Sequence, residues 1–350
     1  MENTIRHRII GGVFGLEVDL EGAQDPQFLR KGDILFVNAR SALYCLVQRL
    51  TPKHIWMPSY LCSSMLDAIR GTNTSIRLYE VDYDLRSPSL KWIAEISRGD
   101  IVVIVDYFGF PADPEIAFKA RKKGAWVLED ACQALLTEVP RSIIDFVIFS
   151  PRKFLGIPDG GILWIQTAKG QVSSISNLLL EPAPQEWWFT AFCSSFLRRE
   201  FDLKGVAHNW FNLFKTSEAH CPIGLYAMSE LSQTLLRQGF NYERIARQRQ
   251  NNYLALLERL ADIALFPNLS TGIIPLGFPV RVPNRDRIQQ ALFNHKIYPP
   301  VHWPLNRHVP EHFRDSHRLA SHLMTLPCDQ RYDIEGMQHM AAVVTKEMRK

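Results

Sequence analysis

Three side chains of different chemical type follow apolar segments of the sequence, where strands of a sheet would end. Asp130 closes the apolar run 126–128, Lys153 follows the run 146–149, and Ser41 begins an amphipathic stretch soon after another such run. Short apolar runs are typical of buried strands, and in a parallel sheet ligands bind outside the carboxyl ends of the strands. These three residues are therefore the first candidates for chemistry.

Lys153 is the candidate nucleophile. The loop that follows it contains Gly156, Pro158, Gly160 and Gly161, and it would let a bulky ligand approach the backbone. A lysine in such a place can form a Schiff base, because desolvation and nearby cations lower its pKa and free the amine. A solvated loop lysine is the alternative, and it is the commoner one for a lysine taken alone.

Asp130 and Ser41 each have a chemical and a structural interpretation. Asp130 would be half-buried at a strand end, where a carboxylate needs a cation or hydrogen-bond donors; the alternative is an aspartate that caps the next helix. The N–H groups of Ser41, Ala42 and Leu43 would face a phosphate at a helix N-terminus; the alternative is an ordinary serine N-cap. Only the joint order of these features favours a functional site.

The composition excludes several classes of protein. In 350 residues there are 40 basic and 36 acidic side chains, so a net charge of +4 gives no reason to expect a nucleic-acid partner. The six cysteines form no CxxC pair and no metal-like spacing, which fits reduced thiols and no metal site. No apolar segment reaches the ~18 residues of a membrane span, and residues 9–15 are too short and glycine-broken for a signal peptide. We therefore expect a cytoplasmic protein without a membrane partner.

Short apolar runs alternate with amphipathic stretches, which predicts an α/β fold with a mostly parallel sheet covered by helices. Seven strands are expected, at residues 34–37, 55–57, 76–81, 101–105, 126–128, 146–149 and 162–165. Helices are expected between them, at 41–50, 63–70 and 114–123. The chain length favours two domains, a large one over residues 1–240 and a smaller C-terminal α+β domain over 241–350.

After residue 165 this alternation stops. Residues 178–213 are rich in aromatic side chains and predict an inserted helical arm, and residues 228–260 predict two helices around Gly239. The aromatic residues of the arm are Trp187, Trp188, Phe189, Phe192, Phe196, Trp210 and Phe211. Aromatic surface of this extent is typical of interfaces, so the arm either packs on its own domain or contacts a second copy of the chain, and the second copy is the favoured interpretation.

The ordered set of motifs along the chain resembles the DegT/DnrJ/EryC1/StrS aminotransferases. These are fold-type-I pyridoxal-phosphate enzymes, most of which act on nucleotide-linked keto sugars. The resemblance spans nearly the whole chain. Its motifs lie at residues 41–43, 58–60, 107–113, 129–133, 149–153, 159–161, 228–231, 297–302 and 326–327.

The resemblance implies roles for residues around the cofactor. Lys153 would hold pyridoxal 5'-phosphate as a Schiff base and later move a proton between carbons, while Asp130 would pair with the protonated pyridine nitrogen. Gln133 would lie near the phenolic oxygen. The phosphate would be bound by Ser41, Ala42 and Ser150, and weaker substrate contacts would come from His302, Tyr60 and Tyr107.

The sequence departs from the family pattern at three places. Ile148 stands where the phosphate-binding serine is usual, and Cys62 stands where an aromatic ring often stacks on the cofactor. Residues 225–227, Leu-Tyr-Ala, replace the Asn-Tyr-Arg that reaches the phosphate from a neighbouring subunit. The change at Ile148 means that Ser150 substitutes or one phosphate contact is lost, and the change at residues 225–227 puts the phosphate contact from the neighbouring subunit in doubt.

The leading interpretation is an aminotransferase that moves an amino group from glutamate or glutamine to a keto sugar, nucleotide-linked, in polysaccharide or secondary-metabolite synthesis. The resemblance also implies a homodimer with both active sites at the interface. Two alternatives stay open. One is a pyridoxal-phosphate-dependent deoxysugar dehydratase, against which Lys153 argues because family dehydratases have histidine there; the other is a degenerate binding or regulatory protein without turnover.

Overall fold

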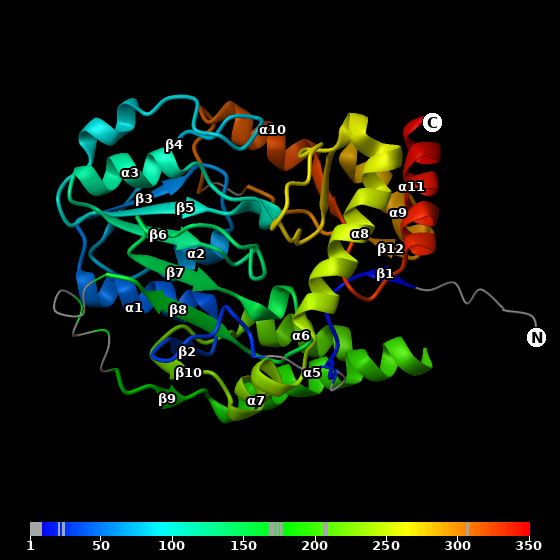
Figure 1. Cartoon of the computed structure of the whole chain (residues 1–350), viewed down its shortest axis with the longest axis horizontal. Coiled ribbons are helices and arrows are strands. Elements are labelled where there is room, and N and C mark those ends of the chain that lie inside the picture. The colour runs from blue at the N-terminus through cyan, green and yellow to red at the C-terminus, as the bar shows by residue number, and fades with distance from the viewer. Residues whose placement is uncertain are drawn as a thin grey trace, which may run out of the picture.

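A nine-stranded sheet forms the centre of the molecule in the computed structural model, which describes residues 9–19, 22, 25–167, 172, 175, 178–205, 209–305 and 308–350. Its strands lie in the order β4-β3-β5-β6-β7-β8-β2-β10-β9 (Figure 1). Their bounds are β2 (Ile34–Phe36), β3 (His54–Pro58), β4 (Ser75–Tyr79), β5 (Ile101–Val105), β6 (Trp126–Asp130), β7 (Phe146–Phe149), β8 (Gly161–Ile165), β9 (Glu181–Pro182) and β10 (Tyr226–Ala227).

Strands β4, β3, β5, β6 and β7 are parallel to one another, and β8 is antiparallel to both of its neighbours, β7 and β2. All seven expected strands are present, so the predicted α/β class and mostly parallel sheet are confirmed. Strands β9 and β10 have two residues each, too few to show any periodicity in the sequence. Because β5, β6 and β7 are parallel neighbours, the residues that follow them meet at one edge of the sheet.

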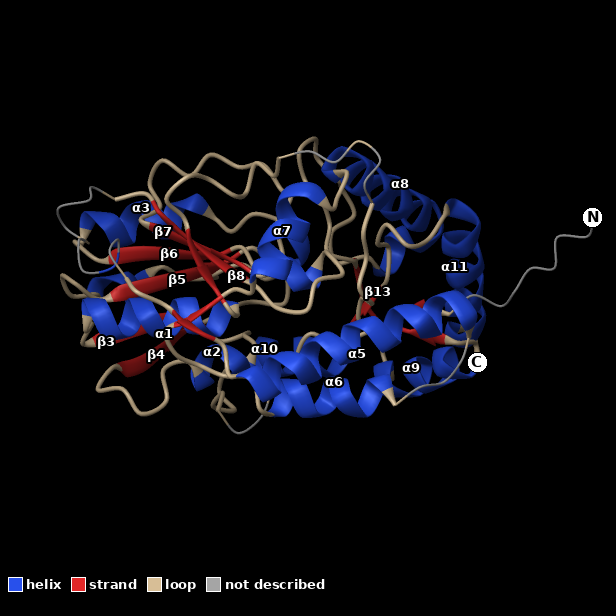
Figure 2. Cartoon of the chain, turned by 90° about the horizontal axis from the view of Figure 1, so that it is seen from below, coloured by secondary structure: helices blue, strands red, loops and turns tan. Residues whose placement is uncertain are grey.

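Helices cover both faces of the sheet. Helices α1 (Ala39–Leu50) and α2 (Ser63–Asp67) lie on one face, and α3 (Pro114–Lys122) lies on the other (Figure 2). Burial on both faces explains why β5 reads Ile-Val-Val-Ile-Val, with every residue buried. The three expected helices are thus confirmed.

The arm predicted at residues 178–213 corresponds to a pair of helices, although residues 181–182 form β9 and the second helix continues to Ala219. It consists of α5 (Gln185–Lys204) and α6 (Trp210–Ala219), which lie side by side along the lower side of the molecule (Figures 1 and 2). The expected helix pair around Gly239 corresponds to α7 (Glu230–Gln238) and α8 (Tyr242–Leu260). No helix in the described part of the chain has the length and apolar character that crossing a membrane requires.

The C-terminal part combines two small sheets with helices. Strand β11 (Phe278–Arg281) pairs antiparallel with β13 (Leu323–Leu326), and β12 (Ile297–Tyr298) pairs in parallel with β1 (Ile10–Gly11). The remaining helices are α9 (Arg285–Asn294), α10 (Arg314–His322) and α11 (Ile334–Met348). This is the α+β composition expected for residues 241–350, although β1 joins it from the other end of the chain. A domain boundary after residue 240 stays a prediction.

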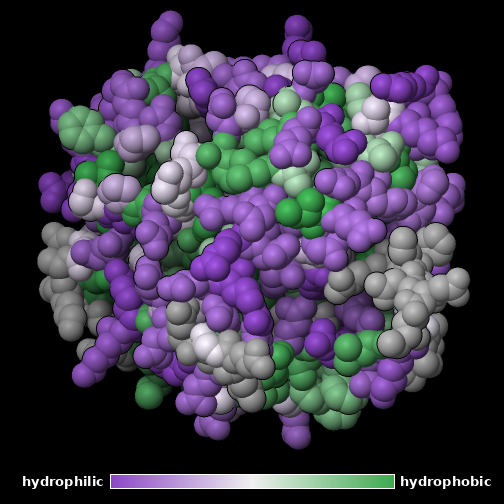
Figure 3. Space-filling view, turned by 45° about the vertical axis from the view of Figure 1, so that its right-hand side comes forward, coloured by the Kyte–Doolittle hydropathy of each residue, from purple (hydrophilic) through white to green (hydrophobic). Residues whose placement is uncertain are grey.

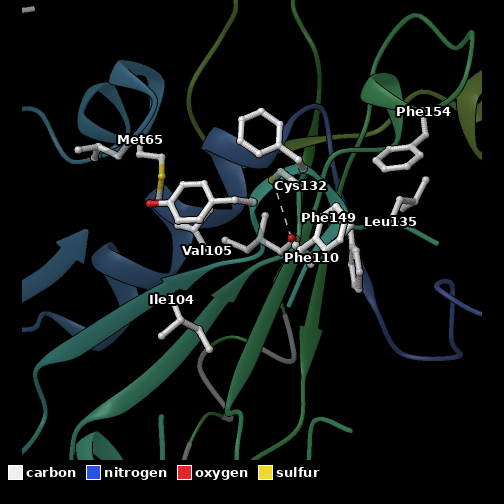
Figure 4. Packing of buried hydrophobic residues seen from close by; sticks show 14 of the residues in the cluster. Met65, Ile104, Val105, Phe110, Cys132, Leu135, Phe149 and Phe154 are labelled. Atoms are coloured by element: carbon white, nitrogen blue, oxygen red, sulfur yellow. Dashed lines mark hydrogen bonds between the residues drawn. The ribbon is translucent and has the colours of Figure 1, made fainter. Parts of the chain in front are cut away.

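The core reaches up to the carboxyl ends of the strands, as Figure 4 shows for Val105, Cys132 and Phe149. Phe154, directly after Lys153, is fully buried. The guanidinium of the fully buried Arg249 lies 4.5 Å from the centre of the Phe154 ring and donates a hydrogen bond of 3.2 Å to the Phe154 carbonyl. The backbone that follows Lys153 is therefore fixed by packing and by a charged hydrogen bond.

Candidate active site

A cavity of about 530 Å³ lies at the carboxyl edge of the parallel strands. Strands β5, β6 and β7 border it from below, the arm helices form one wall, and segments of the C-terminal part close over it. Five of the candidate site residues line this cavity together: Lys153, Asp130, Gln133, Ser150 and His302. Within the described ranges, no group of three His, Cys, Asp or Glu side chains is placed to hold a metal ion.

Lys153 ends a short 3-10 turn, Pro151–Lys153, which begins just after β7. Its N–H donates to the carbonyl of Ser150 at 3.1 Å, and the next two residues, Phe154 and Leu155, are fully buried. The side chain is half-buried on the cavity wall. The backbone that carries the amine is therefore fixed, and the amine lies where it can meet a ligand.

Asp130 is the last residue of β6, and its Oδ1 accepts a hydrogen bond of 3.0 Å from the N–H of Cys132. One oxygen therefore has the local, capping role that was the alternative. The carboxylate also interacts with the thiol of Cys132, and Asp130 lines the cavity, where a ligand can reach it. Burial raises the pKa of the Cys132 thiol, Asp130 raises it further, and Lys153 lowers it, so both charges act on one thiol at the cavity.

Gln133 gives the clearest sign of a missing partner. Its side chain is 2% exposed, and its Oε1 accepts a hydrogen bond of 2.8 Å from the N–H of Phe108, which fixes the orientation of the amide. The Nε2 donor is buried and has no partner among the described residues. An unsatisfied buried donor costs about 1–3 kcal/mol, so this group points to an acceptor that the chain itself does not supply. The phenolic oxygen of pyridoxal phosphate is such an acceptor.

His302 reaches the cavity from the segment that follows β12. Its Nδ1 lies 2.9 Å from Oγ1 of Thr325, on β13. Burial, with the charge of Lys153 as the second cause, lowers the pKa of His302 to about 3. The imidazole is therefore neutral at physiological pH and lies close enough to Lys153 for the two groups to interact.

The two expected pocket tyrosines lie behind the cavity instead of on its wall. Tyr60 and Tyr107 are both buried, and neither lines the cavity. The hydroxyl of Tyr107 donates to the carbonyl of Tyr60 at 2.5 Å, and the hydroxyl of Tyr60 donates to the carbonyl of His302. They thus support the His302 segment from beneath.

The first turn of α1 does not begin at the residue that the sequence predicts. The prediction that Ser41 starts this helix is wrong, because the helix begins at Ala39 and Asn38 caps it by accepting from the N–H of Ser41 at 2.9 Å. Ser41 and Ala42 are fully buried away from the cavity, whereas Ala39 and Arg40 line it. Asparagine caps helices as well as serine does, and the first N–H groups of a helix have no acceptor within it. The N–H groups that could receive a phosphate are therefore those of residues 39 and 40.

Sequence reasoning missed Glu218, the carboxylate at the centre of a charged cluster on the cavity wall. Arg152 donates to Glu218 of α6 with a distance of 2.5 Å between Nη2 and Oε1, and Nη2 of Arg40 lies 3.9 Å from the same carboxylate. Glu218 raises the pKa of Arg152, and Arg152 in turn lowers the pKa of Glu218. Glu218 stands 66 residues from Arg152 in the chain, in a helix without any recognisable motif, so no sequence signal joined them.

The sheet order, together with a lysine and an aspartate at the carboxyl edge of its parallel strands, defines the class of the protein as a fold-type-I pyridoxal-phosphate enzyme. A family model narrows this class to one family. The model of the DegT/DnrJ/EryC1/StrS aminotransferase family matches residues 55–345, and the chain belongs to that family. It is accordingly an aminotransferase whose cofactor is pyridoxal phosphate.

Solved structures of sugar-pathway and other aminotransferases share the fold of this chain. Helicobacter pylori PseC, an aminotransferase involved in the biosynthesis of pseudoaminic acid, shares 15% identity with a TM-score of 0.67, covering 91% of this chain and 86% of its own. DesV of S. venezuelae shares 17% identity with a TM-score of 0.65, covering 97% and 92%. DesI, determined in the presence of its TDP-sugar product, shares 16% with a TM-score of 0.67, covering 98% and 94%. Comparison with curated protein sequences finds no match.

Proposed function

We propose that this enzyme transfers an amino group from glutamate or glutamine to a nucleotide-linked keto sugar, in the synthesis of a surface polysaccharide or a secondary metabolite. The observation that carries the proposal is the joint placement of Lys153, Asp130 and the unpaired amide of Gln133 on one cavity. The sugar part is supported by PseC, whose name links it to pseudoaminic acid, and the nucleotide part by the TDP-sugar product of DesI.

The chain's own residues fit the cofactor. Lys153 would hold it covalently, the carboxylate of Asp130 would meet the pyridine nitrogen, and Nε2 of Gln133 would donate to the phenolic oxygen. Ser150 and the first turn of α1 would receive the phosphate. When bound, pyridoxal phosphate supplies a ring that accepts electrons from the carbon next to the amino group.

The protein's part in the reaction is the control of protons. The carboxylate of Asp130 stabilises a proton on the pyridine nitrogen, and the ε-amine of Lys153 takes a proton from one carbon and delivers it to another. His302 is neutral and has its Nδ1 engaged by Thr325, so its Nε2 is left to contact the substrate without competing for that proton.

The proposal is tested with purified protein and added pyridoxal phosphate. We expect an absorbance band near ~420 nm that disappears when glutamate or glutamine is added and returns with a nucleotide-linked keto sugar. A protein that forms no such band would contradict the proposed cofactor chemistry. A band that no amino donor bleaches would instead favour the alternative of a binding protein without turnover. That alternative has one structural point in its favour, because Cys62 lines the cavity where the family often has an aromatic ring.

We further propose a homodimer that packs through the arm and brings both cavities to the interface. Four apolar side chains of the arm are strongly exposed: Phe189 (61%), Phe196 (46%), Leu203 (56%) and Phe211 (52%). The three on α5 recur every seventh residue and so form one stripe, and Figure 3 shows hydrophobic side chains gathered along the lower edge, at the level of the arm in Figure 1. The same helices line the cavity. Light scattering decides the point, since a fully active particle of 40.2 kDa at micromolar concentration would refute the dimer.

For the cellular location we propose the cytoplasm. All six cysteines are free thiols, and three of them, Cys45, Cys132 and Cys328, are buried. Thiols stay reduced in that compartment. We expect small-molecule substrates and no nucleic-acid partner, in keeping with the net charge of +4.

A further inference from the structure

The wall of the cavity next to the first turn of α1 carries two arginines that none of the roles above uses. Arg40 is the second residue of α1, and Arg152 directly precedes Lys153. Both side chains line the same cavity as Lys153. Two guanidinium groups beside the free N–H groups of a helix N-terminus form a surface suited to a phosphate.

One carboxylate of the arm is hydrogen-bonded to Arg152 and lies near Arg40. Glu218 lies in the last turn of α6, 2.5 Å from Arg152 and 3.9 Å from Arg40. The side chain of Arg152 is 24% exposed and donates to no other described residue, so its other N–H groups remain for a second acceptor. The charge of Lys153 also lowers the pKa of Glu218, which places the cluster within electrostatic reach of the candidate nucleophile.

The segment that directly follows the arm, residues 221–224, is bonded to the N-terminal end of α1. The side-chain amide of Asn38 donates to the carbonyl of Pro222 at 2.7 Å and to the sulfur of Cys221 at 3.2 Å. The N–H of Gly224 donates to the hydroxyl of Ser41 at 3.3 Å. The position of Glu218 is thus tied to the helix end whose N–H groups face the cavity.

We propose that Arg40 and Arg152, positioned by Glu218 of the arm, bind the phosphate of the cofactor, so that this end of the site is built within a single chain. The inference rests on the proposed cofactor chemistry. It assigns a role to the arm, and it accounts for the absence of the Asn-Tyr-Arg sequence at residues 225–227, because the positive charge comes from the same chain.

The test compares two ligands that differ only in the phosphate. Apoprotein is titrated with pyridoxal phosphate and with pyridoxal, and the dissociation constants are measured from the absorbance change. For Arg152→Gln we expect binding of pyridoxal phosphate to weaken about tenfold or more, because a charged hydrogen bond is lost, with binding of pyridoxal unchanged. Arg40→Gln should act in the same direction and serves if the first variant does not fold. Arg49→Gln, at the exposed other end of α1, is the matched control and should bind both ligands as wild type does.

Glu218 is tested as a positioning residue. Glu218→Ala should weaken binding of pyridoxal phosphate, and Glu218→Gln should restore it, because the amide oxygen still accepts from Arg152. Equal losses for both ligands in the arginine variants, or unchanged binding of pyridoxal phosphate, would overturn the inference while leaving the proposed function intact. Tighter binding in Glu218→Ala would show that the carboxylate competes with the phosphate and would also overturn it. A wild type that binds neither ligand would refute the proposed function, and this inference with it.

Discussion

Replacement of His302 by asparagine should change how the stability of the enzyme depends on pH. In the unfolded chain this histidine has its ordinary pKa of 6.5, whereas in the folded protein burial and Lys153 lower the pKa to about 3. Between these values the unfolded chain binds a proton that the folded chain does not. Wild-type stability therefore suffers no loss from His302 above about pH 6.5, and the loss grows as the pH falls toward about 3.

The size of the effect follows from the shift. Each pH unit below 6.5 costs up to about 1.4 kcal/mol, so two units cost up to about 2.7 kcal/mol. The His302 side chain is only half-buried against the cavity, so water screens part of this free-energy cost. We therefore expect the free energy of unfolding to change by about 1–2 kcal/mol. Asparagine can keep the hydrogen bond to Thr325 but does not titrate.

Urea unfolding of wild type and His302→Asn, followed by circular dichroism at about pH 7 and about pH 4.5, measures this change. The variant should gain stability relative to wild type at the lower pH. Other groups with shifted pKa values, such as Glu17, Asp33 and Asp145, are present in both proteins and cancel in the difference. A difference between the two proteins that is the same at both pH values would refute the placement of a neutral His302 beside Lys153.

Three further substitutions test the site and its support. Lys153→Ala should abolish covalent attachment of the cofactor and turnover; borohydride reduction and peptide mapping check this, and a label on another lysine would remove Lys153 from its role. Asp130→Asn should keep the fold but slow turnover by about a hundredfold or more, since an amide cannot stabilise a protonated pyridine nitrogen, and wild-type turnover would exclude it from the mechanism. Gly161→Ala should destabilise the fold by on the order of 3 kcal/mol, because a Cβ there would lie 2.2 Å from the carbonyl carbon of Asn38 and 2.4 Å from the nitrogen of Ala39. Urea unfolding measures the loss, and a variant as stable as wild type would contradict the close packing of β8 on the start of α1.

The sequence was sufficient to predict those parts of the fold in which position along the chain determines position in space. Asp130 ends β6 and Lys153 follows β7, so apolar periodicity could place both residues at the carboxyl edge of the sheet, whereas their roles around a cofactor came from the family resemblance. Strand β10 could not be predicted in this way, because two residues show no period. Serine and asparagine cap helices equally well, so the choice of Asn38 over Ser41 depended on where β2 ends in three dimensions.

The contacts that complete the site could not be predicted from the sequence, for a different reason. The N–H of Phe108 fixes the orientation of the Gln133 amide, and its Nε2 then has no partner among the described residues. The ion pair of Arg152 with Glu218 joins a turn after β7 to the last turn of a helix in the arm. Neither contact follows from the types of the residues involved, since both depend on how distant segments pack.

The place of β2 in the sheet has a consequence for how the protein is made. This strand is synthesised early, yet its partners are β8, at residues 161–165, and β10, at residues 226–227. Strands β3 to β6 pair only with one another and with β7, so these five strands can assemble first on the ribosome, before β8 is available to pair with β7. At that stage the outer edge of β7, with all four of its residues apolar, has no neighbour. We expect this unfinished edge to make nascent chains that stop before residue 161 the most prone to aggregate, because an apolar strand edge pairs readily with another chain.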